Sequence, residues 1–66
     1  MNIVLNGETK PFETPLTVAE LLARLGLAGA RVAVEVNHEI VPRSRHGERV
    51  LSDRDRVEVV RAIGGG

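Results

Sequence analysis

The sequence predicts an α+β domain in which one helix covers a mixed sheet of four to five strands. Apolar and polar residues alternate over residues 32–37 and again over 57–59, which is typical of half-buried strands. Between the first strands and these later ones, residues 18–25 place apolar side chains at helical spacing. A lone helix and a sheet that each carry an apolar face bury those faces against each other.

Length and composition restrict the class of protein. The 66 residues make one domain, and a core this small supplies roughly 3–5 kcal/mol, with no room for a deep catalytic cleft. We therefore expect a protein that partner enzymes act on, not an enzyme. Nine basic and nine acidic residues cancel, and Phe12 is the only aromatic residue, which disfavours binding to nucleic acid or to anionic membranes. The absence of cysteine, of a signal sequence and of a membrane-length apolar run predicts a cytoplasmic location.

The first twelve residues predict a β-hairpin. Ile3 and Leu5 lie on one face of its first strand. Asn6-Gly7 suits a two-residue type I′ turn, because both positions of that turn need positive φ. Pro11 has no N–H to donate, so we expect the second strand at an edge of the sheet.

Residues 17–26 predict a capped helix. Thr17 and Glu20 have the spacing of a capping box, and Leu16 and Leu21 have that of a hydrophobic staple. Gly26 suits the left-handed position that ends a helix. The stripe expected to face the sheet consists of Val18, Leu21, Leu22 and Leu25.

The second half of the chain predicts three further strands. Residues 31–37 form the clearest one, and 40–41 give a short apolar return that ends at a proline. Residues 50–51 are expected to be a short strand or a plug for the core. A polar turn at 52–55 then leads into the last strand, 56–62.

The order of these elements is strand, strand, helix, strand, short strand, strand. Apart from the short strand this is ββαββ, the arrangement of the ubiquitin-like β-grasp fold. In that fold the first and last strands lie side by side in the middle of the sheet. We expect a β-grasp domain over residues 1–63 and a flexible glycine tail over 64–66. A one-helix α+β sheet of ferredoxin-like or other topology is the alternative.

The tail Gly64-Gly65-Gly66 has two interpretations. Without side chains it can thread a narrow slot in a partner enzyme and present a terminal carboxylate there. Alternatively it is a frayed terminus without function. It has no lysine and no following helix, so it is not a phosphate-binding loop.

Five segments in order resemble the ThiS family, the ubiquitin-like sulfur carriers of thiamine biosynthesis. They are Asn6-Gly7-Glu8, residues 17–22, residues 32–37, residues 40–43, and residues 57–60 before the terminal glycines. The resemblance covers essentially the whole chain. The related carrier of molybdopterin synthase tends to have prolines shortly before its diglycine, where this chain has Arg61-Ala62-Ile63.

The resemblance implies a chemistry for the tail. A ThiF-type adenylating enzyme would use MgATP to convert the Gly66 carboxylate into an acyl-adenylate. Sulfur from a persulfide donor would then displace AMP and leave a thiocarboxylate, which a ThiG-type thiazole synthase consumes. Gly64 and Gly65 would give access to these active sites, and the chain itself would bind no cofactor. Another sulfur-carrier role, such as the molybdopterin-type small subunit, a ubiquitin-like modifier and a plain interaction module are the alternatives.

The sequence also offers a docking surface for these partners. Val4, Val60 and Ala62 are expected on the sheet face that the helix does not cover. If the first and last strands are adjacent, Val4 would lie beside Val60, in an apolar patch that leads through Ile63 to the tail. Exposed apolar patches often mark partner sites.

The remaining polar residues have less specific interpretations. His38 and His46 lack regular spacing and cysteine neighbours, so we expect solvated loop histidines and no metal site. Arg43, Arg45 and Arg49 either dock an acidic partner or keep a loop solvated.

Two positions depart from the family pattern. Arg54 stands where a glycine is common, so the 52–55 turn is expected to be wider. His46 stands near a position where an aromatic residue is expected.

Overall fold

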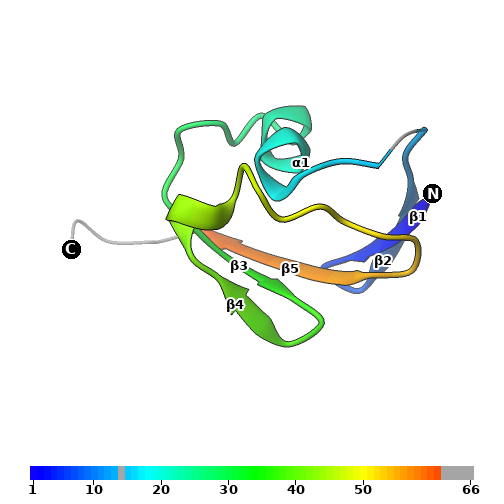
Figure 1. Cartoon of the computed structure of the whole chain (residues 1–66). Helices are drawn as coiled ribbons and strands as arrows, with labels where there is room; N and C mark the ends of the chain where they lie inside the picture. The colour runs from blue at the N-terminus through cyan, green and yellow to red at the C-terminus, as the bar shows by residue number, and fades with distance from the viewer. Residues whose placement is uncertain (14, 62–66) are drawn as a thin grey trace.

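The computed structural model describes residues 1–13 and 15–61, which form a five-stranded mixed sheet with a helix packed across one face (Figure 1). The spatial order of the strands is β2-β1-β5-β3-β4. β1 and β5 are parallel, whereas β1–β2, β3–β5 and β3–β4 are antiparallel. The elements are β1 (Asn2–Leu5), β2 (Glu8–Pro11), α1 (Val18–Arg24), β3 (Val32–Val36), β4 (Glu39–Val41), a 3₁₀ helix (Arg43–Arg45) and β5 (Arg56–Arg61). This is the predicted β-grasp topology, with the first and last strands adjacent.

The β1–β2 hairpin confirms the turn prediction. Asn6 and Gly7 both have positive φ, at 47° and 82°, as a type I′ turn requires. β2 lies at the edge of the sheet, so the missing N–H of Pro11 costs no ladder hydrogen bond.

The N-terminus of α1 carries the predicted capping box. The Glu20 N–H donates to Thr17 Oγ1 over 3.1 Å, and the Thr17 N–H donates to Glu20 Oε1 over 2.9 Å. The backbone N–H of Thr17, followed by its hydroxyl, holds the pKa of Glu20 below its ordinary 4.5. The Thr17 hydroxyl and the Glu20 carboxylate stabilise the first turn, because they accept from N–H donors that have no partner within the helix.

The C-terminus of α1 forms a Schellman motif. Gly26 takes the left-handed conformation, with φ at 74°. Its N–H donates to the Ala23 carbonyl over 3.1 Å, and the Leu27 N–H donates to the Leu22 carbonyl over 2.8 Å. Gly26 therefore ends the helix as predicted, and Leu27 folds back toward it.

The core lies between α1 and the facing side of the sheet. Leu51 is buried as a plug, as predicted, whereas its neighbour Val50 is exposed. Leu25 was expected on the buried stripe but is 36% exposed, because it caps a helix of only seven residues and lies past its packed turns. The buried apolar residues are Ile3, Leu5, Leu16, Val18, Leu21, Leu22, Val34, Val36, Val41, Leu51 and Val57.

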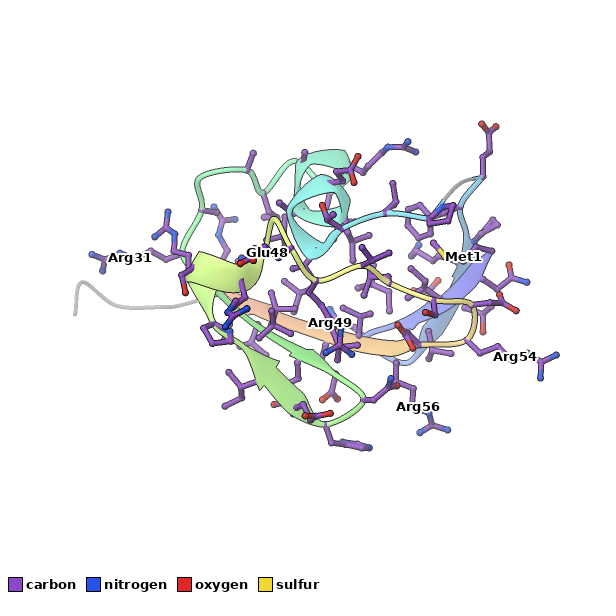
Figure 2. All side chains as sticks on the ribbon, in the orientation of Figure 1. Met1, Arg31, Glu48, Arg49, Arg54 and Arg56 are labelled. Carbon is purple, nitrogen blue, oxygen red and sulfur yellow. The ribbon has the colours of Figure 1, made fainter. Side chains whose placement is uncertain are left out.

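The turn before β5 is tighter than expected. The Asp55 N–H donates to the Ser52 carbonyl over 3.1 Å, which closes a four-residue turn. Arg54 accommodates this geometry by taking positive φ, at 70°, while its side chain projects away from the sheet (Figure 2). The expectation of a wider turn was wrong, because the residue adopts the left-handed backbone that glycine favours.

Thr14 and residues 62–66 lie outside the described part of the chain, so the predicted boundary at residue 63 and the tail 64–66 remain predictions. Within the described ranges, no helix has the length and hydropathy needed to cross a membrane.

Candidate functional site

The described part of β5 ends at Arg61, at the end of the sheet away from the N-terminus (Figure 1). β1 stops earlier: its last pair with β5 joins Leu5 to Val57, whereas β3 continues alongside β5 until Val32 pairs with Arg61. The last residues of β5 therefore have a strand on one side only.

Asn6 compensates for the early end of β1. Its Oδ1 accepts from the Val59 N–H over 2.8 Å, and its Nδ2 donates to the Val59 carbonyl over 3.2 Å. The side-chain amide thus pairs with β5 where the main chain has already turned away. This contact fixes β5 two residues before its described end.

The predicted docking patch is not continuous. Val4 is paired with Arg56, and Val60 is paired with Ala33, so the expectation that Val4 lies beside Val60 was wrong. The error lies in the register, because the Asn6-Gly7 turn ends β1 before it reaches the level of Val60. Val60 remains 64% exposed, and Ala62 and Ile63 lie outside the described residues. Docking through any of these residues stays a prediction.

The centre of the uncovered sheet face is acidic. Glu35 is paired with Glu58 across β3 and β5, and His38 follows in the β3–β4 turn. One potential ligand atom from each of these three residues lies within 4.8 Å of the others. This group could not be predicted from the sequence, because the pairing of the two glutamates depends on a long-range register. Exposed groups of this kind are common without a metal ion, and no metal role is assigned to it.

His46 is not the solvated loop residue that was expected. It is 8% exposed, and its Nε2 lies 3.1 Å from the Val41 carbonyl oxygen, to which it donates as the protonated nitrogen. Its own carbonyl accepts from the Ala19 N–H at the start of α1 over 2.8 Å. The histidine therefore joins the loop after β4 to the helix.

The three arginines near His46 do not form one cluster. Arg43 lines a pocket beside α1, whereas Arg45 and Arg49 line a separate hollow next to Ile40. They were grouped in the sequence because they are close along the chain, but Arg43 and Arg45, at the two ends of the 3₁₀ helix, line different hollows, and Arg49 shares the hollow of Arg45.

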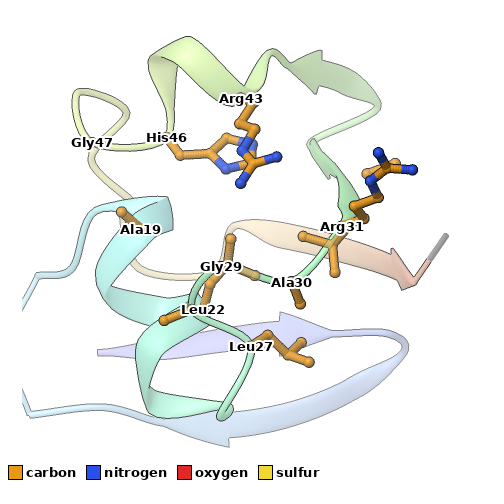
Figure 3. A pocket seen from close by; sticks show the side chains of 12 residues that line it. Ala19, Leu22, Leu27, Gly29, Ala30, Arg31, Arg43, His46 and Gly47 are labelled. Atoms are coloured by element: carbon orange, nitrogen blue, oxygen red, sulfur yellow. The ribbon is translucent and has the colours of Figure 1, made fainter.

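The pocket beside α1 has a volume of about 520 Å³ (Figure 3). We call it the helix–loop pocket, because it lies between α1, the loop that leads into β3, and the segment that contains the 3₁₀ helix. No local pattern in the sequence predicts this pocket. Its lining consists of Ala19, Leu22, Leu27, Ala28, Gly29, Ala30, Arg31, Val32, Ala33, Arg43, His46 and Gly47.

The predicted reactive residue, Gly66, and the access residues Gly64 and Gly65 lie outside the described part of the chain. The structure describes the folded domain that precedes these residues. β5 runs through the centre of the sheet and ends at Arg61, five residues before Gly66 in the sequence.

The fold places this protein in the class of small ubiquitin-like β-grasp domains. After its central strand, β5, the sequence continues to three glycines. The model of the ThiS family matches residues 3–66. The chain belongs to the ThiS family.

Three relatives illustrate this membership. The sulfur carrier protein ThiS of Bacillus subtilis is 44% identical over 63 residues, which cover 94% of this chain and 96% of that protein. The crystal structure of the thiamine biosynthesis protein (ThiS) from Geobacter metallireducens has a TM-score of 0.86 and 36% identity, with full coverage of both chains. A thiazole synthase of Paramagnetospirillum magneticum is 46% identical over all 66 residues, but this chain spans only 20% of its length.

Proposed function

We propose that this chain is a sulfur carrier in which the Gly66 carboxylate receives and delivers the sulfur. The observation that carries the proposal is the family match, which extends through residue 66 and so includes all three terminal glycines. A relative of nearly the same length is named a sulfur carrier protein. The structure supports the proposal because the central strand of a well-packed sheet leads toward this segment.

The chemistry requires activation of the carboxylate. A carboxylate is a poor electrophile, because its charge is delocalised and oxide is a poor leaving group. In the proposed sequence a ThiF-type enzyme binds MgATP, the Gly66 carboxylate attacks the α-phosphorus, and pyrophosphate leaves. The terminal sulfur of a persulfide donor then attacks the acyl-adenylate and displaces AMP. A thiol cleaves the resulting acyl disulfide and releases the thiocarboxylate.

In this scheme the chain is a cosubstrate and its partners are the catalysts. Gly64 and Gly65 contribute by the absence of side chains, which allows a narrow active-site channel to close around them. The domain contributes positioning, because docking converts an encounter of two molecules into a reaction within one complex, which can be worth several kcal/mol of barrier. The cofactor MgATP belongs to the partner enzyme.

We further propose that the sulfur is used for thiazole formation. A segment similar to this whole chain forms about a fifth of a protein named thiazole synthase, which supports a ThiG-type synthase as the acceptor. The expected cytoplasmic location is part of the same proposal, because the partner enzymes draw on MgATP.

The mass of the intact chain tests the proposal. The chain is incubated with the adenylating enzyme, MgATP and a persulfide donor, and we expect a mass gain equal to the exchange of one oxygen for sulfur. Omission of MgATP should prevent the gain. An additional residue after Gly66 should also prevent it while the circular dichroism spectrum stays unchanged.

Other outcomes point to other functions. Covalent conjugates with other polypeptides would identify a ubiquitin-like modifier. An unchanged mass under all conditions would contradict a carrier role. Transfer of the sulfur to a thiazole synthase, followed by return of the original mass, distinguishes the thiazole carrier from one that serves molybdopterin synthase.

A further inference from the structure

The lining of the helix–loop pocket combines an apolar floor with basic groups. Leu22, Leu27 and Val32 are among the apolar residues of the lining. The charged residues in it are Arg31 and Arg43, and no described acidic residue lines it. Because the whole chain carries nine basic and nine acidic residues, this pocket is a local excess of positive charge on a protein of zero formal charge.

Hydrogen bonds hold one wall of the pocket in place. The carbonyls of His46 and Arg49 accept from the N–H groups of Ala19 and Val18, over 2.8 and 2.9 Å. The His46 ring is fixed in turn by the Val41 carbonyl. The segment with the 3₁₀ helix is therefore tied to the first turn of α1, which would otherwise have unpaired donors.

The opposite wall is equally constrained. It begins with the Schellman motif, in which the Leu27 N–H donates to the Leu22 carbonyl. The Ala30 N–H then donates to the Leu27 carbonyl over 3.0 Å, around Gly29 at positive φ. Figure 3 shows this loop facing Arg43 and His46 across the pocket. Because both walls are formed before any ligand arrives, binding there would cost little ordering entropy.

The position of the pocket limits what can occupy it. Val32 lines the pocket and is paired with Arg61, the last described residue of β5. The five residues after Arg61 span at most about 18 Å when fully extended. Any enzyme that holds Gly66 in its active site therefore binds with that site within about 18 Å of Arg61, the residue paired with Val32 of the pocket lining.

We infer that the helix–loop pocket receives a carboxylate side chain, together with a neighbouring aliphatic side chain, from the surface of the adenylating enzyme. The inference rests on the proposed function, which supplies this partner. The carboxylate pairs with Arg43, which forms no ion pair with any carboxylate in the described ranges. The aliphatic group covers the floor around Leu22 and Leu27. A protein partner is favoured over a small molecule because the pocket adjoins the strand end where the enzyme has to bind.

Charge reversal at two neighbouring arginines tests the inference. Arg43→Glu places a negative charge in the pocket, whereas Arg45→Glu makes the same change on the same 3₁₀ helix but in a different hollow. We expect Arg43→Glu to raise the Kd for the adenylating enzyme about 10-fold or more, and Arg45→Glu to raise it less than about 3-fold. Isothermal titration calorimetry measures both, and circular dichroism confirms that both variants are folded.

A second measurement locates the contact. When unlabelled adenylating enzyme is added to the ¹⁵N-labelled chain, we expect the amide signals of Gly29, Ala30 and Gly47 to shift or broaden. Equal weakening by the two charge reversals would show general electrostatic steering and overturn the inference, as would unchanged affinity of Arg43→Glu. Shifts of the same signals by hexanoate but not by the enzyme would also overturn it, because the pocket would then be a small-molecule site.

The two proposals fail in different ways. If the wild-type chain gains sulfur but Arg43→Glu behaves like Arg45→Glu, the carrier function stands and the pocket inference falls. If the wild-type chain neither binds the adenylating enzyme nor gains sulfur, both fall.

Discussion

The two faces of the sheet differ in what they do for the fold. On the face under α1, side chains such as Ile3, Val36 and Val57 are completely buried. On the other face, Ile40 is 75% exposed and is paired with Glu35, and Val60 is 64% exposed and lies two residues after Glu58 in β5. The described part of this small domain contains one α-helix, which can cover only one face of the sheet.

Because of this difference, the strand residues that stabilise the fold and the strand residues available to bind a partner lie on opposite faces of the sheet. Residues on the covered face determine whether the chain folds, since burying one aliphatic side chain contributes about 1.5–3 kcal/mol, whereas the net stability of so small a domain is only a few kcal/mol. Residues on the uncovered face contribute little to folding. They can therefore be changed to test docking without loss of the domain.

The sharpest test compares two valines in β5. Val57→Ala removes two methyl groups from a fully buried site, and we expect it to lower the free energy of unfolding by about 2 kcal/mol. Val60→Ala makes the same chemical change on the uncovered face, and we expect an effect within about 0.5 kcal/mol. Urea denaturation followed by circular dichroism measures both. Equal losses would contradict the assignment of the two faces.

The next effect concerns the hydrogen bonds that fix β5 beyond the end of β1. Asn6→Gly removes both contacts to Val59 but keeps a residue suited to the positive φ at this position. We expect the free energy of unfolding to fall by about 1–2 kcal/mol, because each of the two exposed hydrogen bonds contributes about 0.5–1 kcal/mol. Glu8→Ala, on the exposed side of the same hairpin, is the control and should change stability by less than about 0.5 kcal/mol. If the Asn6→Gly variant is as stable as wild type, the amide does not support the strand.

Local patterns explain why much of the fold could be predicted. Alternation over residues 32–37 and 57–59 predicted half-buried strands, because side chains on successive strand residues point to opposite faces, and Val34, Val36 and Val57 are buried accordingly. The capping box and Gly26 fixed both ends of α1, because these signals act within one helical turn. The β-grasp topology could then be predicted from the order of the elements, since a single helix between two pairs of strands allows few arrangements of the strands in one sheet.

Long-range contacts explain what could not be predicted. No turn joins β1 to β5, so nothing local sets their register. It depends instead on contacts such as the Asn2 N–H donating to Asp53 Oδ1 over 2.7 Å. The error in placing Val4 beside Val60 has this origin. The burial of His46 and the helix–loop pocket likewise arise where segments far apart in sequence meet. The roles of the tail residues remain predictions.

A smaller effect concerns the helix that covers the buried face. Thr17→Ala removes the N-cap hydroxyl, and we expect a loss of about 1 kcal/mol. Glu20 adds a dependence on pH. Because the capping contacts lower its pKa in the folded state, its contribution is present above the ordinary value of 4.5 and is lost as pH falls through the lower, folded-state pKa.

We therefore expect Glu20→Gln to flatten the decline of stability in that acidic range, as followed by urea denaturation at a series of pH values. Glu48→Gln is a matched control on an exposed loop and should leave the decline as in wild type. An acid profile of Glu20→Gln that coincides with that of wild type would contradict a charged capping contact.

The smallest effect belongs to the turn before β5, which lies on neither face. Arg54 holds positive φ, a conformation that costs about 1–2 kcal/mol for a residue with a β-carbon. Arg54→Gly removes this strain but adds backbone entropy to the unfolded chain, worth about 0.5–1 kcal/mol, so we expect a net gain of about 0.5 kcal/mol. Arg54→Ala also loses the exposed ion pair with Asp53 but keeps the strain, and it should give no gain. Thermal unfolding of the three proteins side by side measures the difference. Equal melting temperatures for the glycine and alanine variants would contradict this prediction. They would mean that the positive φ of Arg54 stores no strain that glycine can relieve.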